Sequence, residues 1–192
     1  MDEIDHQIIE ACQTGNAAAF AQVVLRYERP LLAYVYRLGC TPPSRGPEDV
    51  VQEVFVKAYK NIRLYKGRDG GSFSTWLFSI ARNHCVSLMR RRQLEDRAIR
   101  PMDDTEVQAD PAHGPAEILS RRETARQVAD AVAALPETQR SVFVLRYYED
   151  LSYEAIARIV ECNVGTIRSR LARAKKAIQE QLQAAGVDRR ES

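Results

Sequence analysis

Apolar residues recur every three to four positions along most of the chain, with polar residues between them. This spacing is typical of amphipathic helices, and the alternation that would indicate strands is absent. Pro30 either kinks a helix that begins after Asn16 or divides it in two, and Gly39 ends it. The other helix starts are expected at Asp2, Pro47, Ser74 (an N-cap), Pro136, and after the N-caps Ser152 and Asn163. A further helix before Pro136 is expected to carry Ala125, Val128, Val132 and Leu135.

The stretch from Leu151 to Ile178 predicts a helix-turn-helix, with a short break at residues 161–163 between its two helices. In the second helix, one buried stripe leaves a cationic, donor-rich face pointing outward. That face carries Thr166, Arg168, Ser169, Arg173 and Lys176. Such a helix fits the DNA major groove, although an antiparallel helix pair with a solvated basic face would show the same charges.

A change in composition divides the chain. Residues 101–120 hold three prolines, one glycine, five acids and no Lys or Arg, which is typical of a flexible linker. We therefore expect a domain over 1–97, a linker over 98–117, a second domain over 118–185 and a polar tail over 186–192. The expected fold class is all-α: two small helical domains joined by an acidic flexible linker, the C-terminal one carrying the helix-turn-helix.

Composition and charge exclude several classes of function. With 45% hydrophobic and 28% charged residues and a net charge of only +2, the chain is an ordinary globular protein and not a polycation. The first ten residues are acidic and hold no Lys or Arg, and no apolar run approaches the roughly 20 residues of a membrane span. We expect a cytoplasmic protein with no signal peptide and no direct membrane insertion.

Titratable and thiol residues are not arranged for catalysis or metal binding. The four cysteines, Cys12, Cys40, Cys85 and Cys162, form no CxxC pair, and only three histidines are present. His84 falls on an apolar helix face and is interpreted as a core histidine. Without a nucleophile constellation, phosphate loop or ligand spacing, we expect no enzyme, no catalytic residue, no cofactor and no metal.

Two stretches of the N-terminal domain have polar faces of different character. The helix from Pro47 starts with Glu48, Asp49, Gln52 and Glu53 and ends with bases, an order that the helix dipole alone would explain. The helix after the loop 66–72 places Trp76 beside Asn83 and several arginines, which suits unstacked bases. The alternative is that Trp76 and Phe73 close the core while the arginines are solvated.

Three segments resemble successive motifs of the extracytoplasmic-function (ECF) sigma factors of the sigma-70 family, in the order of the family, and the resemblance extends over nearly the whole chain. They are PEDVVQEVFVKAYKNI, FSTWLFSIARNHCVSLMRRR and LPETQRSVFVLRYYEDLSYEAIARIVECNVGTIRSRLARAKKAI. The resemblance implies an alternative sigma factor, which binds core RNA polymerase, recognises the −35 and −10 promoter elements and initiates promoter opening. It also implies an anti-sigma factor acting in trans and a linker that enters a polymerase channel.

The resemblance assigns a role to three sets of residues. Contact with the clamp helices of the polymerase largest subunit falls to Glu48, Asp49, Gln52 and Glu53, with a further contact of the protein to the flap. Recognition and melting of the −10 element, including capture of a non-template base, fall to Lys66, Arg68, Ser72, Phe73, Trp76, Arg82, Asn83, Arg90 and Arg91. Reading of the −35 duplex falls to Thr166, Arg168, Ser169, Arg170, Arg173 and Lys176.

Some positions depart from the family pattern. Glu161 stands where glycine is usual in the helix-turn-helix, Ser87 replaces a common Asp, and the loops at 40–46 and before Phe73 are long. These departures leave the promoter sequence open. Two other functions are weighed against the sigma factor: a stand-alone helix-turn-helix regulator, which would need a sensor or dimerisation module in its N-terminal half, and a decoy that sequesters polymerase.

Overall fold

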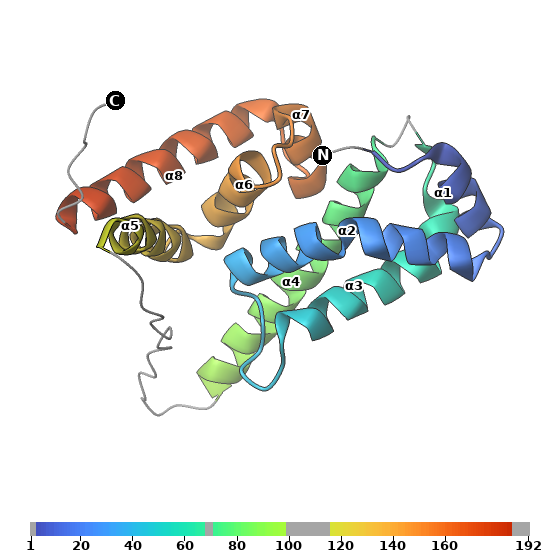
Figure 1. Ribbon diagram of the computed structural model, residues 1–192, viewed down its shortest axis with the longest axis horizontal. Helices are drawn as coiled ribbons and strands as arrows, with labels where there is room; N and C mark the ends of the chain where they lie inside the picture. The colour runs from blue at the N-terminus through green and yellow to red at the C-terminus, as the bar shows by residue number, and fades with distance from the viewer. Residues whose placement is uncertain (1–2, 68–70, 99–115, 186–192) are drawn as a thin grey trace.

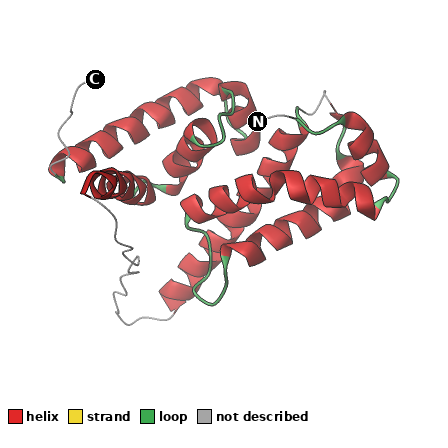
Figure 2. Ribbon diagram, in the orientation of Figure 1, coloured by secondary structure: helices red, strands yellow, loops and turns green. Residues whose placement is uncertain are grey.

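The computed structural model describes residues 3–67, 71–98 and 116–185, and over these ranges it is helical without a strand (Figures 1 and 2). The predicted all-α fold of two helical domains is confirmed. The helices are α1 (His6–Gln13), α2 (Ala17–Leu38), α3 (Pro47–Asn61), α4 (Phe73–Ala98), α5 (Ala116–Ala133), α6 (Glu137–Tyr147), α7 (Tyr153–Val160) and α8 (Val164–Ala184), with a 3-10 turn η1 (Ile62–Leu64) after α3.

Three of the predicted N-caps hold their helices as expected. The side chain of Asn16 accepts hydrogen bonds from the first-turn amides of α2, Ser152 does so for α7, and Asn163 accepts from the Thr166 amide at 2.7 Å in α8. Gly39 ends α2 in the left-handed conformation, with φ of 64°, which glycine adopts without steric cost. These boundaries follow from residues within one helical turn.

Two helix starts differ from the sequence interpretation, and the alternative left open at Pro30 is decided. The helix α1 begins at His6, with Asp5 as its N-cap, and not at Asp2. The helix α2 runs through Pro30 as one element, held by the fully buried Tyr27 and Leu31 on either side. The N-cap assigned to Ser74 is wrong, because α4 begins at Phe73 and the Ser72 hydroxyl accepts from the Thr75 amide at 3.2 Å. Ser74 lies inside the first turn, where its amide and its hydroxyl donate to the Glu3 carboxylate.

Helices α1–α4 form one unit, which we call the N-terminal unit. The helices α2 and α3 run side by side in opposite directions, and α4 packs across both (Figure 1). The largest buried side chains are aromatic: Tyr27, Tyr34, Phe73 and Phe78 are all 0% exposed. Removal of their apolar surface from water stabilises the folded unit.

Helices α5–α8 form the C-terminal unit. The helix α8 packs against α5, α6 and α7, so it contacts every other helix of the unit. Its inward stripe is Ile167, Leu171, Ala174 and Ile178, all buried, as the spacing predicted. The exact domain limits given above stay predictions, because residues 99–115 lie outside the described part of the chain.

The two units are docked on each other. The helix α4 packs against α7, and α2 packs against α6. Polar contacts mark the junction: the Tyr34 hydroxyl is 3.0 Å from that of Ser141, and an Arg140 N–H donates to the Leu38 carbonyl at 2.9 Å. Beside them the Arg37 guanidinium lies 4.0 Å from the centre of the Tyr148 ring. The described helices thus adopt a closed arrangement.

The turn of the helix-turn-helix has a left-handed residue. Glu161 ends α7 with φ of 56° and ψ of 49°. A side chain with a Cβ pays a steric penalty in this region, and glycine does not. Glu161 thus adopts the left-handed backbone that favours glycine, the residue usual at this position of the family. The turn keeps its geometry, and the Glu side chain bears the steric penalty.

Replacing Glu161 by glycine is expected to stabilise the protein by about 1 kcal/mol, because the penalty of the Cβ is removed. Urea unfolding followed by circular dichroism measures the change. The matched control is Glu161→Ala, which removes the carboxylate but keeps the Cβ, so no gain is expected from it. Equal gains in both variants would assign the penalty to the charge and contradict the backbone explanation.

A carboxyl group is buried beside the contact between the units. Glu149 follows α6, and its side chain is only 6% exposed. Burial raises the pKa of this carboxyl group to about 7, opposed in part by the charge of Arg37. The folded state therefore binds this proton more tightly than an unfolded chain, in which a Glu titrates near pH 4.3.

Glu149→Gln is expected to be more stable than the wild type at pH 8 by roughly 1–2 kcal/mol, since the wild type must there hold a buried carboxylate. The raised folded pKa means that wild-type stability is lost as pH rises from about 4.3 to 7. The advantage of the variant should therefore shrink as pH falls towards 4. Thermal melts across this range test it, and a pH-independent difference would contradict the raised pKa.

Candidate functional site

The N-terminal turns of the helix α3 carry an acidic surface. Glu48 and Asp49 are exposed in its first turn, where the helix dipole favours acids, and the Asp49 carboxylate accepts from the Gly46 amide at 3.0 Å. Gln52 is exposed one turn later. These side chains border a groove of about 520 Å³ between α2 and α3, lined by Phe20, Val24, Glu28, Leu32, Glu48, Asp49, Val51, Gln52, Phe55, Val56, Tyr59 and Lys60. An apolar floor with an acidic rim can hold a basic amphipathic helix.

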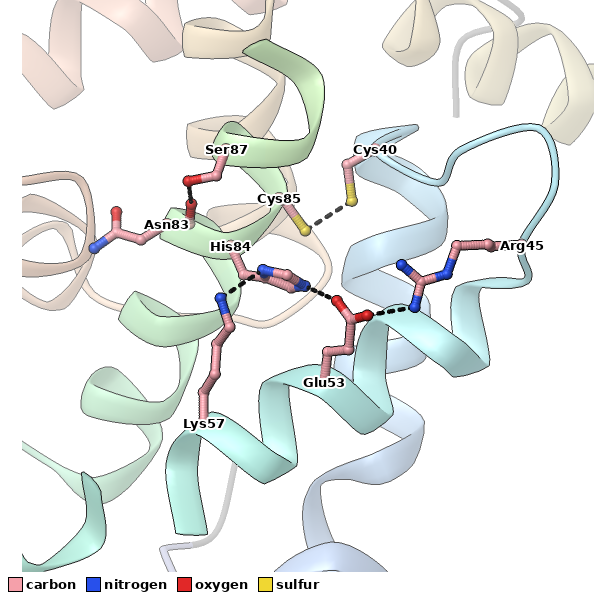
Figure 3. A network of polar contacts seen from close by, with 8 residues as sticks. All are labelled: Cys40, Arg45, Glu53, Lys57, Asn83, His84, Cys85 and Ser87. Carbon is pink, nitrogen blue, oxygen red and sulfur yellow. Dashed lines mark hydrogen bonds and ion pairs between the residues drawn. The ribbon is translucent and has the colours of Figure 1, made fainter. Parts of the chain in front are cut away.

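The fourth acidic residue of this set has a different environment. Glu53 is half-buried and bridges two partners (Figure 3): Arg45 forms an ion pair with it, and His84 Nε2 lies 2.7 Å from its Oε2. The hydrogen bond from Arg45 is the main cause that lowers the pKa of the Glu53 carboxyl group. Its charge is thus largely compensated within the chain, unlike that of Glu48 and Asp49.

His84 is buried as expected, at 7% exposure, but it is also hydrogen-bonded on both ring nitrogens. Lys57 can only donate and the Glu53 carboxylate can only accept, so neutral His84 carries its proton on Nε2 and accepts from Lys57 on Nδ1. Burial, then the charge of Lys57, lowers the pKa of His84. The histidine therefore links α3 to α4 in its neutral form.

The aromatic residues at the start of α4 are not equally available. Phe73 is fully buried, with its ring centre 5.7 Å from that of Tyr27, 5.4 Å from that of Tyr65 and 5.3 Å from that of Trp76. It closes the core, as the alternative interpretation held, while Trp76 is only partly buried. Lys66 and Ser72 are exposed beside them, and Arg68 lies outside the described residues.

The remaining α4 residues assigned to the −10 element differ in exposure, because the contact between the two units covers one of them. Arg82 is 18% exposed and lies 4.0 Å from the Glu137 carboxylate of α6, and it donates to Asn83 Oδ1 at 3.2 Å. Asn83, Arg90 and Arg91 are exposed. Trp76 and Asn83 therefore lie on the same helix and are at least partly exposed, whereas Arg82 faces the C-terminal unit.

A contact that sequence reasoning missed lies at the N-terminal end of α4. A Cβ added at Gly71 would lie 3.0 Å from Nη1 of Arg158, a residue of α7. The helix-turn-helix therefore lies against the loop before α4. No local pattern could have indicated this, because the two residues are far apart in the sequence.

The outward face of α8 carries the cationic side chains that its periodicity predicted. Arg168, Ser169, Arg173 and Lys176 are exposed, and Arg170 is half-buried. Thr166 lies at the N-terminal end, where its amide and hydroxyl both donate to Asn163. These side chains lie in the first four turns of α8, and the Ser169 hydroxyl already donates to the Thr166 carbonyl at 2.9 Å.

The described residues contain no cluster of three or more His, Cys, Asp or Glu side chains that could hold a metal ion. In the same part of the chain, no helix is both long and apolar enough to cross a membrane.

Comparison with known proteins identifies both units. Residues 23–95 match the sigma-70 region 2 family, and residues 125–178 match the sigma-70 region 4 family. The RNA polymerase sigma-H factor of Pseudomonas aeruginosa is 35% identical over 189 residues, which cover 94% of this chain and 95% of that protein. The ECF RNA polymerase sigma-E factor of Escherichia coli is 34% identical over 190 residues, covering 93% and 94%.

Two solved structures are similar over most of their length. RpoE from Bartonella quintana, in complex with the anti-sigma factor NepR, is 30% identical with a TM-score of 0.69, covering 88% of this chain and 98% of that one. CnrH, in complex with the cytosolic domain of CnrY, is 26% identical with a TM-score of 0.66, covering 94% and 97%. Region 2 followed by region 4, over nearly the full length of sigma-factor relatives, means that this chain belongs to the ECF sigma factors of the sigma-70 family.

Proposed function

We propose that this chain is a dissociable, non-catalytic subunit that binds core RNA polymerase, recognises the −35 and −10 promoter elements and initiates promoter opening. The observation that carries the proposal is the succession of a region 2 and a region 4 match along one chain that aligns with sigma factors from end to end. As a transcription factor that contacts DNA and polymerase, it would act in the cytoplasm.

Glu48, Asp49 and Gln52 are the residues we propose to contact the clamp helices of the polymerase largest subunit. Their exposure at the rim of an apolar groove supports this role, since a basic coiled coil would find both charge and apolar complementarity there. Glu53 would contribute indirectly, because its bond to His84 connects α3 to α4 and its ion pair with Arg45 holds the loop before α3. The contact with the flap would fall to the C-terminal unit.

We assign recognition of the opened −10 strand to Trp76, Asn83, Lys66 and Ser72, with Arg82, Arg90 and Arg91 along the same helix. Stacking of a base on an aromatic ring is worth about 1–3 kcal/mol, and Phe73 would support the Trp76 ring from the core side. In the closed arrangement Arg82 faces Glu137 and the Gly71 loop faces Arg158. Binding of the strand would therefore require that α6 and α7 move away from α4.

Reading of the −35 duplex is assigned to Thr166, Arg168, Ser169, Arg170, Arg173 and Lys176. The exposure of most of these side chains along one face of α8 supports insertion into a major groove. Because the chain resembles RpoE, which was solved with the anti-sigma factor NepR, we also propose control by an anti-sigma factor acting in trans.

The proposal is tested with purified full-length protein, core RNA polymerase and a promoter recovered by sequencing DNA bound in vivo. The protein is expected to bind core polymerase, direct run-off transcription and make the −10 region sensitive to permanganate. Tight duplex binding without polymerase, together with no binding to core, would instead indicate a stand-alone regulator. Core binding without permanganate sensitivity would indicate a sequestering decoy.

Two variants are expected to separate the roles of the two units. Arg173→Ala should lose about 1–3 kcal/mol of −35 discrimination in the holoenzyme, as the loss of one base-reading arginine does, while core binding is kept. Asp49→Lys should weaken core binding because its charge opposes a basic partner. Fluorescence anisotropy with labelled core and labelled promoter measures both.

Asp49→Asn serves as the matched control, because its amide oxygen can still accept from the Gly46 amide at the start of α3. It should fold like the wild type and lose part of the core affinity through the charge alone. Equal loss of core binding in Arg173→Ala and Asp49→Lys would contradict the division of roles.

A further inference from the structure

Two cysteines that are 45 positions apart in the sequence meet inside the N-terminal unit. Cys40 follows Gly39 at the end of α2, Cys85 lies in α4, and their Sγ atoms are 2.7 Å apart (Figure 3). A disulfide is about 2.05 Å long, so its formation would need an approach of only roughly 0.7 Å by the two sulfur atoms. The other two thiols, Cys12 and Cys162, lie in α1 and in the turn of the helix-turn-helix.

A cavity of about 250 Å³ lies beside this pair. It is lined by Cys40 together with residues of the loop before α3 and of α4, among them Pro42, Leu88 and Arg91. The space is sufficient for several water-sized molecules, and a small solute inside it would lie against Cys40, although this residue is itself buried, at 4% exposure. Cys85 does not line the cavity and is 0% exposed. The two thiols thus differ in access, and Cys40 is the one a solute meets first.

We propose that Cys40 and Cys85 are a redox-sensitive pair that forms a reversible disulfide in the presence of hydrogen peroxide. First, the Cys40 sulfur, after losing its proton to water in the cavity, attacks one peroxide oxygen. The O–O bond breaks, the departing hydroxide is protonated to water, and Cys40 becomes a sulfenic acid. The Cys85 sulfur then attacks the Cys40 sulfur, the S–O bond breaks, and the hydroxyl leaves as water with the proton of Cys85.

In this reaction two thiols and one peroxide give one disulfide and two waters, so the sulfur atoms are oxidised and the peroxide is reduced. A dithiol reductant restores both thiols by exchange. The contact with Cys40 and burial raise the pKa of the Cys85 thiol. This supports the order of attack, because a protonated and inaccessible thiol reacts second.

The bond would connect the two elements on which the C-terminal unit docks. The end of α2 receives Arg140 at the Leu38 carbonyl, two residues before Cys40, and α4 packs against α7. A cross-link between them would stiffen this platform and, in the unfolded chain, would close a loop between residues 45 positions apart, which favours the folded state. The inference concerns the folded chain alone and does not rest on the proposed promoter recognition.

The test uses the full chain, reduced, freed of reductant and treated with hydrogen peroxide. Mass spectrometry is expected to find the loss of two hydrogen atoms and a cross-linked peptide pair containing Cys40 and Cys85, both reversed by dithiothreitol. The oxidised protein should melt at least about 3 °C above the reduced protein. Hydrogen exchange of the backbone amides around Leu38 should slow after oxidation.

The double variant Cys12→Ala/Cys162→Ser keeps the pair and should repeat every result of the wild type. Cys40→Ser and Cys85→Ala each break the pair and should show neither the cross-link nor the rise in melting temperature. If peroxide oxidises Cys162 while Cys40 and Cys85 stay free, or if Cys40 oxidises without a cross-link to Cys85, the proposal is wrong. A cross-link that leaves hydrogen exchange and melting unchanged would overturn the stiffening of the platform.

Discussion

The helix α4 is packed on two sides, and the arrangement of the whole molecule depends on this. One side closes the core of the N-terminal unit through Phe73, Leu77 and Phe78, each 0% exposed. Another side receives α7, so buried residues of both units belong to one continuous hydrophobic cluster. The same helix carries the residues assigned to the −10 strand. If the proposed assignment holds, docking of the C-terminal unit and binding of single-stranded DNA would compete for one element.

The polar contacts between the units are few and specific. Tyr34 with Ser141, and Arg140 with the Leu38 carbonyl, set the register of docking. Within the described part of the chain, Arg82 Nε and Glu137 Oε1 are buried at this junction without a hydrogen-bond partner, which costs free energy in the closed state, and the ion pair of Arg82 Nη2 with Glu137 Oε1 at 4.0 Å offsets this cost only in part. An interface that is partly polar and partly unsatisfied separates more easily than a core. This suits a protein whose two units must reach two DNA elements at once.

The α3 surface illustrates how packing divides residues of one local charge pattern. Glu48 and Asp49 remain exposed at the helix start, where dipole and solvent both favour them. Glu53 lies one turn further along the helix, where it pairs with Arg45 at the surface and with the buried His84. The surface available to a basic partner is therefore narrower than the acidic stretch of the sequence. The network beneath it keeps α3 in place against α4.

Most of the local structure could be predicted from the sequence. The caps at Asn16, Ser152 and Asn163, the end of α2 at Gly39 and the buried stripe of α8 depend on residues within a turn or two of one another. Periodicity and capping therefore determined the all-α class and the helix-turn-helix. Periodicity and capping gave the wrong N-cap at Ser74, because Ser72 and Ser74 each carry a hydroxyl that could cap the helix. The two are distinguished by contacts: Ser72 accepts from the Thr75 amide, and the Ser74 amide donates to the distant Glu3.

Tertiary structure decided which of the candidate residues are exposed and which are buried or paired within the chain. The burial of Phe73, the pairing of Glu53 with His84 and the meeting of Cys40 with Cys85 join residues that are 31 to 46 positions apart. The docking of Arg158 beside Gly71 spans a still longer separation. Helical periodicity indicates which face of a helix is buried, but not which partner covers it. That choice depends on the fit of two surfaces, which exists only after the helices have packed.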